Sequence, residues 1–361
     1  GTYLDAGAPP REGDRFRQPR LAETLRRLSR TGLDDFYRGG LAQAIAADLS
    51  RAGSPLSLAD LERHQALRVA PLTATVAGQR LYNMPPPTQG LASLMLLGIY
   101  ARLGIAEAEG FDFVHGLVEA TKRAFRVRDR HVTDPAYMDA DPASFLEDAA
   151  LDAMAADIDP ARALPWPEAS AKGDTVWLGA IDSEGRAVSF IQSIYWEFGA
   201  GTVLDETGIT WQNRGVSFSL DPGHHNVLKP FRRPFHTIQP ALAQLPDGRV
   251  MVYGTMGGEG QPQTQAMLFA RHVLHGQDLQ EAVSAPRWLL GRTWGAAATS
   301  LRIEDRIDPA VIAALRTAGH EIEMVGPFDE VMGHAGALVW RPDGLMEGAA
   351  DPRSDGQVAA F

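Results

Sequence analysis

The chain has 361 residues, of which 45% are hydrophobic and 22% charged, a composition typical of a globular protein with one large domain or two. The formal net charge of -11 argues against a nucleic-acid partner, because no basic stripe is present to neutralise phosphates. The absence of cysteine excludes disulfides, thiolate metal sites and a cysteine nucleophile.

No apolar run approaches the roughly 20 residues that span a bilayer, and the start does not have the pattern of a signal peptide. We therefore expect a cytoplasmic protein with no membrane partner. Because the sequence begins at Gly1 without methionine, its native start can lie further upstream, and a periplasmic location stays open.

The first half of the chain is predicted to be mostly helical. Leucines recur at helical spacing over 17–32, and a glycine ends the pattern. Further helical patterns follow at 34–53, 57–64, 90–103, 110–130 and 144–156. Alternating β-branched residues over 70–84 indicate one or two strands. The prolines of "PPPTQG" (85–90) then predict a rigid turn, because each proline fixes its φ angle.

The second half is predicted to be rich in sheet. The segment 157–174 is proline-rich, polar and aperiodic, and it is predicted to be an exposed loop. Hairpin-like strands are expected over 175–213 and 238–255, a helix over 262–275, and a final strand–helix–strand section after it. The sheet-rich half therefore begins at Thr175.

The position of Thr175 after an exposed loop suggests a catalytic role. A threonine hydroxyl is a poor nucleophile unless a base takes its proton, and its own α-amine can do so only when threonine is N-terminal. Cleavage before Thr175 would create that amine at the start of an ordered strand. Taken alone, however, the junction is more typical of a structural threonine.

Two other segments carry candidate binding groups. In "YGTMGGEGQPQTQAM" (253–267) a strand, two glycines and a helix follow one another, so backbone N–H groups could face a ligand or an oxyanion. In "LKPFRRPFHTIQPAL" (228–242), Arg232 and Arg233 could hold a carboxylate. A tight turn without a ligand and a solvated loop are the alternatives.

Metal and serine-hydrolase chemistry have little support in the sequence. His224 and His225 are adjacent and would point in different directions, and no H-E-x-x-H motif occurs. No G-x-S-x-G motif is present either. We therefore expect neither a metal nor a cofactor.

Several stretches together resemble the gamma-glutamyltransferase family of N-terminal-nucleophile hydrolases. "MPPPTQG" resembles part of the family's large subunit, and "GDTVWLGAIDSEGRAVSF" its processing junction. "EFGAGTVLDETGITWQN", "MGG" and "EGAADPRSDG" are similar to signatures of the small subunit. This resemblance covers essentially the whole chain and reverses the structural interpretation of Thr175.

The resemblance implies an α+β, four-layer αββα sandwich that cleaves itself between Asp174 and Thr175. Residues 1–174 would be the large-subunit part, and residues 175–361 the catalytic small-subunit part. Thr175 would be the nucleophile, and Ser193 the hydroxyl residue that supports it. The N–H groups of Gly257 and Gly258 would form the oxyanion hole.

One region of the family has no counterpart here. The large subunit of the family normally has a long additional N-terminal region, with an arginine that binds the substrate carboxylate. Nothing in this sequence matches that region. The chain is therefore expected to be part of a longer protein or a rearranged member of the family.

The substrate positions differ from those of glutamyl enzymes. Ser217 replaces an aspartate that grips the α-ammonium group, Arg214 replaces a glutamine, and Tyr195 replaces an asparagine. His236, with Thr237 beside it, replaces one of a serine pair. Positive charge from Arg214, and from His236 when protonated, should favour a carboxylate.

We therefore expect hydrolysis of a small-molecule amide of the oxamate or glutaryl type. The alternatives are hydrolysis or transfer with glutathione-like gamma-glutamyl donors and, in another class, a non-catalytic binding remnant on the same fold. A homodimer is compatible with the sequence.

Overall fold

The computed structural model describes residues 2–5, 7–166, 174–291 and 299–361, which form two compact units. The first unit comprises Gly1–Arg68 and Phe198–Asn213, and the second comprises Val69–Glu197 and Arg214–Phe361. Each unit contains residues from both sides of the predicted cleavage point between residues 174 and 175. Of the predicted loop 157–174, residues 167–173 lie outside the described part of the chain.

The first unit contains four short helices: α1 (Pro19–Thr31), α2 (Asp35–Arg38), α3 (Gly40–Arg51) and α4 (Leu58–Arg63). At the start of α4, the backbone N–H and the hydroxyl of Ser57 both donate to Asp60 Oδ2 (2.8 and 2.7 Å). The prediction of one helix over 34–53 is wrong. Gly39 adopts an extended conformation, and the Asp35 carboxylate accepts a hydrogen bond from the backbone N–H of Leu41 instead.

The segment 198–213 packs into the small core of this unit. Its backbone is held by two buried side chains of the helices: Thr24 donates to the carbonyl of Thr207 (2.8 Å), and Asp48 accepts from the N–H of Glu206 (2.9 Å). The apolar core consists of Leu41, Ala42, Ile45, Leu49, Leu61 and Leu204. The helical unit is therefore completed by a segment that lies beyond Thr175 in sequence.

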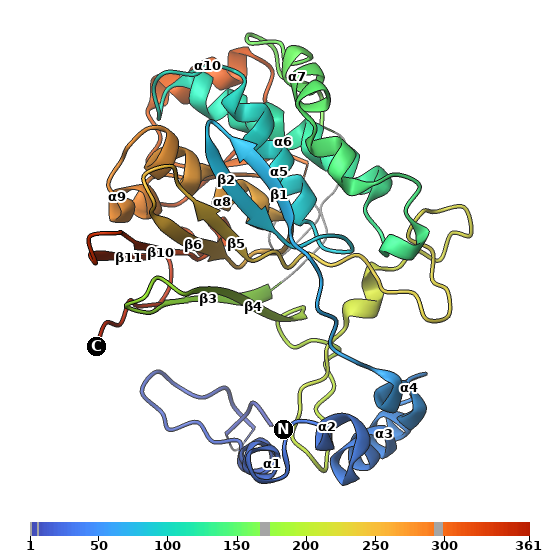
Figure 1. Ribbon diagram of the computed structural model, residues 1–361. Helices are drawn as coiled ribbons and strands as arrows, with labels where there is room; N and C mark the ends of the chain where they lie inside the picture. Colours follow the sequence, from blue (N-terminus) through green and yellow to red (C-terminus); the bar gives the residue numbers. More distant parts are fainter. Residues whose placement is uncertain (1, 6, 167–173, 292–298) are drawn as a thin grey trace. The chain divides into compact units, whose positions relative to one another are not determined.

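A six-stranded antiparallel sheet forms the centre of the second unit (Figure 1). Its strands, in spatial order, are β1 (Leu72–Val76), β2 (Gln79–Asn83), β5 (Ala241–Gln244), β6 (Val250–Thr255), β10 (Ala335–Trp340) and β11 (Met346–Ala350). The strands predicted over 70–84 are confirmed as the hairpin β1–β2. Strand β2 pairs with β5, so the sheet joins segments from both halves of the sequence.

Helices α5 (Gly90–Ala101) and α8 (Gln261–Phe269) cover one face of this sheet, and α6 (Phe111–His131) packs on both of them. Helix α5 is buried on every side from Gly90 to Tyr100 because it lies between the sheet, α6 and α8. A helix that is apolar all round is suited to this position. Helix α7 (Asp148–Ala156) packs on α5 where Leu151 contacts Gly98.

The hairpin of β3 (Asp174–Ile181) and β4 (Ala187–Tyr195) lies on the other face, against β6 and β10 (Figure 1). The indole of Trp177 lies over Gly254 and Gly336, where any Cβ would collide with it, and its Nε1 donates to Ser189 Oγ (2.9 Å). These contacts fix the position of β3 at Trp177, two residues after Thr175. The prediction of strands as far as residue 213 is wrong, because β4 ends at Tyr195.

The remaining elements extend the second unit. They are α9 (Leu279–Ser284), α10 (Pro309–Thr317) and the three-stranded sheet of β7 (Trp288–Leu290), β8 (Leu301–Glu304) and β9 (Ile322–Val325). A π-helical turn, Ala270–Leu274, continues α8. Within the described residues, no helix is long and apolar enough to cross a bilayer.

A buried ion-pair network anchors the end of the chain. Arg353 pairs with Glu304 (2.6 Å) and Asp351 (3.0 Å), and Asp351 also pairs with Arg287 (2.6 Å). The carboxylate of Asp351 also accepts from the N–H of Ala335, the first residue of β10. The "DPR" of the terminal signature therefore ties the last segment to the start of β10.

Candidate active site

Thr175 lies at an irregularity in the β3–β4 ladder. Asp174 pairs with Tyr195, but Val176 pairs with Gln192, so the register shifts at Thr175. Such bulges change the direction of a side chain and occur often near active sites. Thr175 Oγ1 donates to Ser193 Oγ (3.1 Å), and the same oxygen accepts from the N–H of Tyr195 (2.9 Å). Tyr195 has a φ angle of 82°, in the left-handed region.

Thr175 also lines a cavity of about 600 Å³. Met256, which immediately precedes the glycine pair, lines the same cavity. Its other walls come from β3, β10 and the segment 356–361. Thr175 and the residue that precedes the glycine pair therefore border the same cavity.

The glycine pair lies where predicted, between β6 and α8, with φ angles of 115° at Gly257 and 51° at Gly258. Glycine tolerates such angles because it lacks a Cβ. Three successive carbonyls are held: Met256 O by Thr255 Oγ1 (2.8 Å), Gly257 O by the N–H of Gly260 (2.7 Å), and Gly258 O by a side chain described below. In a trans peptide the N–H points opposite to the C=O. The N–H groups of Gly257 and Gly258 therefore face away from the first two of these contacts.

A buried cation lies beside Tyr195. The guanidinium of Arg214 stacks on the Tyr195 ring at 3.8 Å from its centroid, and Nη1 donates to Thr237 Oγ1 (3.3 Å). Burial lowers the pKa of Arg214 to about 10, which leaves the side chain protonated at neutral pH. The predicted substrate positions Tyr195, Arg214 and Thr237 are thus in direct contact.

The other two predicted substrate positions lie nearby in sequence but contribute differently. Burial and the charge of Arg214 lower the pKa of His236 to about 3, so its imidazole is neutral at pH 7, and Nδ1 accepts from the N–H of Ile238 (3.2 Å). The positive charge therefore comes from Arg214 rather than His236. The hydroxyl of Ser217 is buried and has no hydrogen-bond partner within the described residues.

Gln89 connects these groups, and the sequence analysis missed it. Its Nε2 donates to the carbonyls of Thr237 (2.6 Å) and Gly258 (2.7 Å). The backbone of this segment also pairs with the His236 segment, with the N–H of Gln89 donating to His236 O (3.0 Å). In the sequence, the prolines of the turn 85–90 and the motif "MPPPTQG" indicate the turn and the family, but neither indicates that the side chain of Gln89 is buried.

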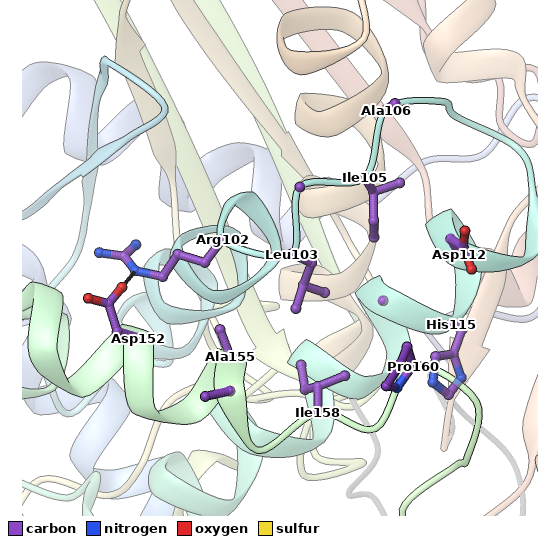
Figure 2. A pocket seen from close by; sticks show the side chains of 13 residues that line it. Arg102, Leu103, Ile105, Ala106, Asp112, His115, Asp152, Ala155, Ile158 and Pro160 are labelled. Carbon is purple, nitrogen blue, oxygen red and sulfur yellow. Dashed lines mark hydrogen bonds and ion pairs between the residues drawn. The ribbon is translucent and has the colours of Figure 1, made fainter.

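A second cavity, of about 770 Å³, lies between the α5–α6 loop and α7 (Figure 2). Arg102 and Asp152 pair at one end, and Asp112 and His115 lie at the other. The lining side chains between them include Leu103, Ile105 and Ile158.

His115 also belongs to a buried cluster with Glu119 and His320, whose nearest ligand atoms lie within 4.8 Å of one another. The cluster does not suit a metal ion. Glu119 already accepts from Lys122 Nζ (2.7 Å) and pairs with Arg123, so two cations offset its charge. His115 Nδ1 and His320 Nε2 hydrogen-bond to each other (2.9 Å). We assign the cluster a structural role.

This cluster should make folding sensitive to acid. Burial, followed by the charge of Lys122 and by His115, lowers the pKa of His320 to about 3. As the pH falls below about 6.5, His320 becomes protonated in the unfolded state but stays neutral in the folded state. The free energy of unfolding therefore falls with pH. At pH 5 the free energy of unfolding is lower by about 2 kcal/mol for this reason. In urea titrations at pH 7 and pH 5, His320→Gln should reduce the drop in stability by about this amount.

The exposed His64 provides the control, because His64→Gln should leave the drop between pH 7 and pH 5 unchanged. An unchanged drop in the His320→Gln variant would contradict this account of the cluster.

Comparisons with known proteins agree with the fold. The gamma-glutamyltranspeptidase family model matches residues 1–361. The chain is 56% identical to the oxamate amidohydrolase proenzyme of Klebsiella pneumoniae over 360 residues, which cover 100% of this chain and 68% of that protein. It is 40% identical to the glutathione hydrolase-like YwrD proenzyme of Bacillus subtilis, over 99% of this chain and 69% of that one.

Among solved structures, a cephalosporin acylase from Bacillus halodurans aligns with a TM-score of 0.90 and 35% identity, over 100% of this chain and 66% of that chain. This likeness confirms the predicted N-terminal-nucleophile hydrolase fold. The chain spans about two thirds of the length of these three relatives. The family match and the 56% identity show that the chain belongs to the gamma-glutamyltranspeptidase family.

Proposed function

We propose that this chain, a self-processing amidohydrolase of the gamma-glutamyltranspeptidase family, acts on the amide of a small carboxylate such as oxamate. The observation that carries the proposal is the protonated Arg214, stacked on Tyr195 at 3.8 Å. Tyr195 is in turn bonded through its N–H to the same Ser193 oxygen that accepts from Thr175. A cation that contacts a residue bonded to the Thr175–Ser193 pair suits a carboxylate that is attached directly to the reacting carbonyl.

The proposed reaction begins with cleavage between Asp174 and Thr175, which divides residues 1–174 from residues 175–361 and frees the α-amine of Thr175. That amine takes the proton of Thr175 Oγ1 as the oxygen attacks the amide carbonyl. The resulting oxyanion would accept from the N–H groups of Gly257 and Gly258. The C–N bond breaks, the leaving nitrogen receives the proton, and water then hydrolyses the ester on Thr175. Oxamate would give oxalate and ammonia.

The name of the Bacillus subtilis relative makes glutathione the second candidate substrate. A gamma-glutamyl donor carries an α-ammonium group, which needs an anionic partner. Arg214 would repel it, and Ser217 is neutral. The third possibility, a non-catalytic remnant, fits neither the amidohydrolase and acylase names of the relatives nor the retention of Thr175.

Substrate preference provides the test. Losing a charge-assisted hydrogen bond costs about 1.5–3 kcal/mol, which corresponds to roughly ten- to a hundredfold in kcat/KM. Processed protein should hydrolyse oxamate in preference to glutathione, and Arg214→Gln should reduce kcat/KM for oxamate by about that factor. Turnover of both amides is measured by release of ammonia and of glutamate.

Arg233→Gln is the matched control, because Arg233 lies in the neighbouring loop but pairs with Asp134 (3.1 Å). This variant should keep the preference of the unmodified protein. A preference for glutathione in the unmodified protein, or an Arg214→Gln variant with unchanged selectivity, would show that the pocket has been assigned to the wrong substrate class.

A further inference from the structure

Gln89 is placed to control the geometry of the glycine loop. It is fully buried, and both N–H bonds of its Nε2 are used, one on Thr237 O and one on Gly258 O. Its Oε1 accepts from Arg128 Nη1 (3.1 Å). Both polar atoms of this amide are therefore engaged, and a satisfied buried amide has little freedom to rotate.

Arg128 holds the other side of the same loop. Its Nη2 donates to Glu259 Oε2 (2.8 Å), and its guanidinium stacks on the Phe125 ring at 3.8 Å from the centroid. Arg128 comes from α6 and is 3% exposed. The guanidinium of Arg128 therefore bonds both to Gln89 and to Glu259, the residue that follows Gly258.

The start of α5 fixes the position of Gln89 itself. Gly90 follows it directly, and a Cβ at Gly90 would collide with the carbonyl oxygen of Met84. The backbone N–H of Gln89 donates to His236 O. The backbone of Gln89 is thus held in place by its neighbours, and its side chain contacts the glycine loop from this fixed position.

We infer that Gln89, braced by Arg128, is a positioning residue: by holding the Gly258 carbonyl it fixes the peptide between Gly258 and Glu259 and so limits rotation about Gly258, whose N–H belongs to the oxyanion-binding pair. This rests on the role of that pair in the proposed function. Without this contact, the peptide between Gly258 and Glu259 can rotate, the backbone torsions at Gly258 can change with it, and the N–H groups of Gly257 and Gly258 no longer converge on one point. A misplacement of about 1 Å in a catalytic site can cost about a hundredfold in rate.

The test compares Gln89→Met with Gln263→Met. Gln263 is also buried, but its two amide atoms bond to the backbone of Leu290 and not to the glycine loop. Gln89→Met should lower kcat by about ten- to a hundredfold with KM changed less than about threefold. Gln263→Met should lower the unfolding midpoint about as much as Gln89→Met does. Its kcat should stay within about twofold of that of the unmodified protein. Gln89→Glu keeps the volume and the acceptor for Arg128 but loses the N–H donors, so it should lower kcat like Gln89→Met.

Two amides, oxamate and gamma-glutamyl p-nitroanilide, separate this inference from the proposed substrate. The preference of the unmodified protein tests the substrate, whereas the ratio of kcat between the two methionine variants should be the same for either amide. Hydrogen exchange followed by mass spectrometry gives a readout without turnover: peptides covering 253–261 should exchange faster in Gln89→Met and not in Gln263→Met. A rise in KM with unchanged kcat, equal effects of both methionine variants, or unchanged exchange over 253–261 would each overturn the inference.

Discussion

Thr175→Ala is expected to leave the protein as one uncut chain. In the proposed cleavage the Thr175 hydroxyl attacks the carbonyl of Asp174, and the acyl group shifts from nitrogen to oxygen before water releases it. Alanine has no oxygen to attack, so the loss should be complete rather than partial. Intact-mass spectrometry and a denaturing gel should show two fragments that meet between residues 174 and 175 in the unmodified protein and a single species in the variant.

Two companion variants make this result specific. Thr175→Ser retains a hydroxyl and should still cleave, more slowly. Thr75→Ala changes an exposed threonine of β1 and should cleave like the unmodified protein. Cleavage of Thr175→Ala at the same bond would sink the assignment of the nucleophile.

Gly258→Val is expected to reduce turnover by about 10²–10³-fold or more, the usual effect of losing one oxyanion donor. Gly258 has a φ angle of 51°, and a β-branched side chain strains the backbone there. The peptide should rotate to relieve that strain and carry its N–H away from the oxyanion. Steady-state kcat is the measurement, with the unfolding midpoint recorded to show that the variant folds.

Gly110→Ala serves as the control, because Gly110 has an ordinary φ of -80° and open space where a Cβ would lie. Its turnover should match that of the unmodified protein. A folded Gly258→Val variant with near-normal kcat would place the oxyanion hole elsewhere.

Elements with strong local patterns could be predicted from the sequence. The apolar run of α5 and the periodic pattern of α6 gave both helices nearly to their ends, and Ser57 with Asp60 marked the start of α4. Gly39 was harder, because a glycine within a helical pattern can be tolerated or can end the helix. The contact of Asp35 with the N–H of Leu41 decides the break here, and it depends on the folded arrangement.

Long-range groupings escaped sequence reasoning altogether. The small helical unit needs the segment 198–213, which joins it through Thr207 and Leu204 rather than through any local pattern. Likewise, Trp177 lies over Gly254 and Gly336, two glycines on different strands that show no pattern linking them to it.

The candidate site also contains both residues that sequence motifs indicate and residues that only the folded structure brings together. Thr175, Ser193 and the glycine pair are proposed from family motifs. Gln89 and Arg128 were not, because glutamine and arginine side chains are mostly exposed in proteins. The burial of both side chains against Gly258 and Glu259 is what gives them a role.

The pairing of β2 with β5 bears on why such a protein would be made as one chain and then cut. The two strands come from opposite sides of the proposed cleavage point. Cleavage there would break the chain but leave the pairing of β2 with β5 intact. Made separately, each piece would present an unpaired strand edge, which is prone to aggregate. A covalent link holds the two partners at an effective concentration in the mM range while the ladder forms. With the proposed cleavage, the precursor would act as a temporary intramolecular chaperone for its own central sheet, and the link would become dispensable once β2 and β5 are paired.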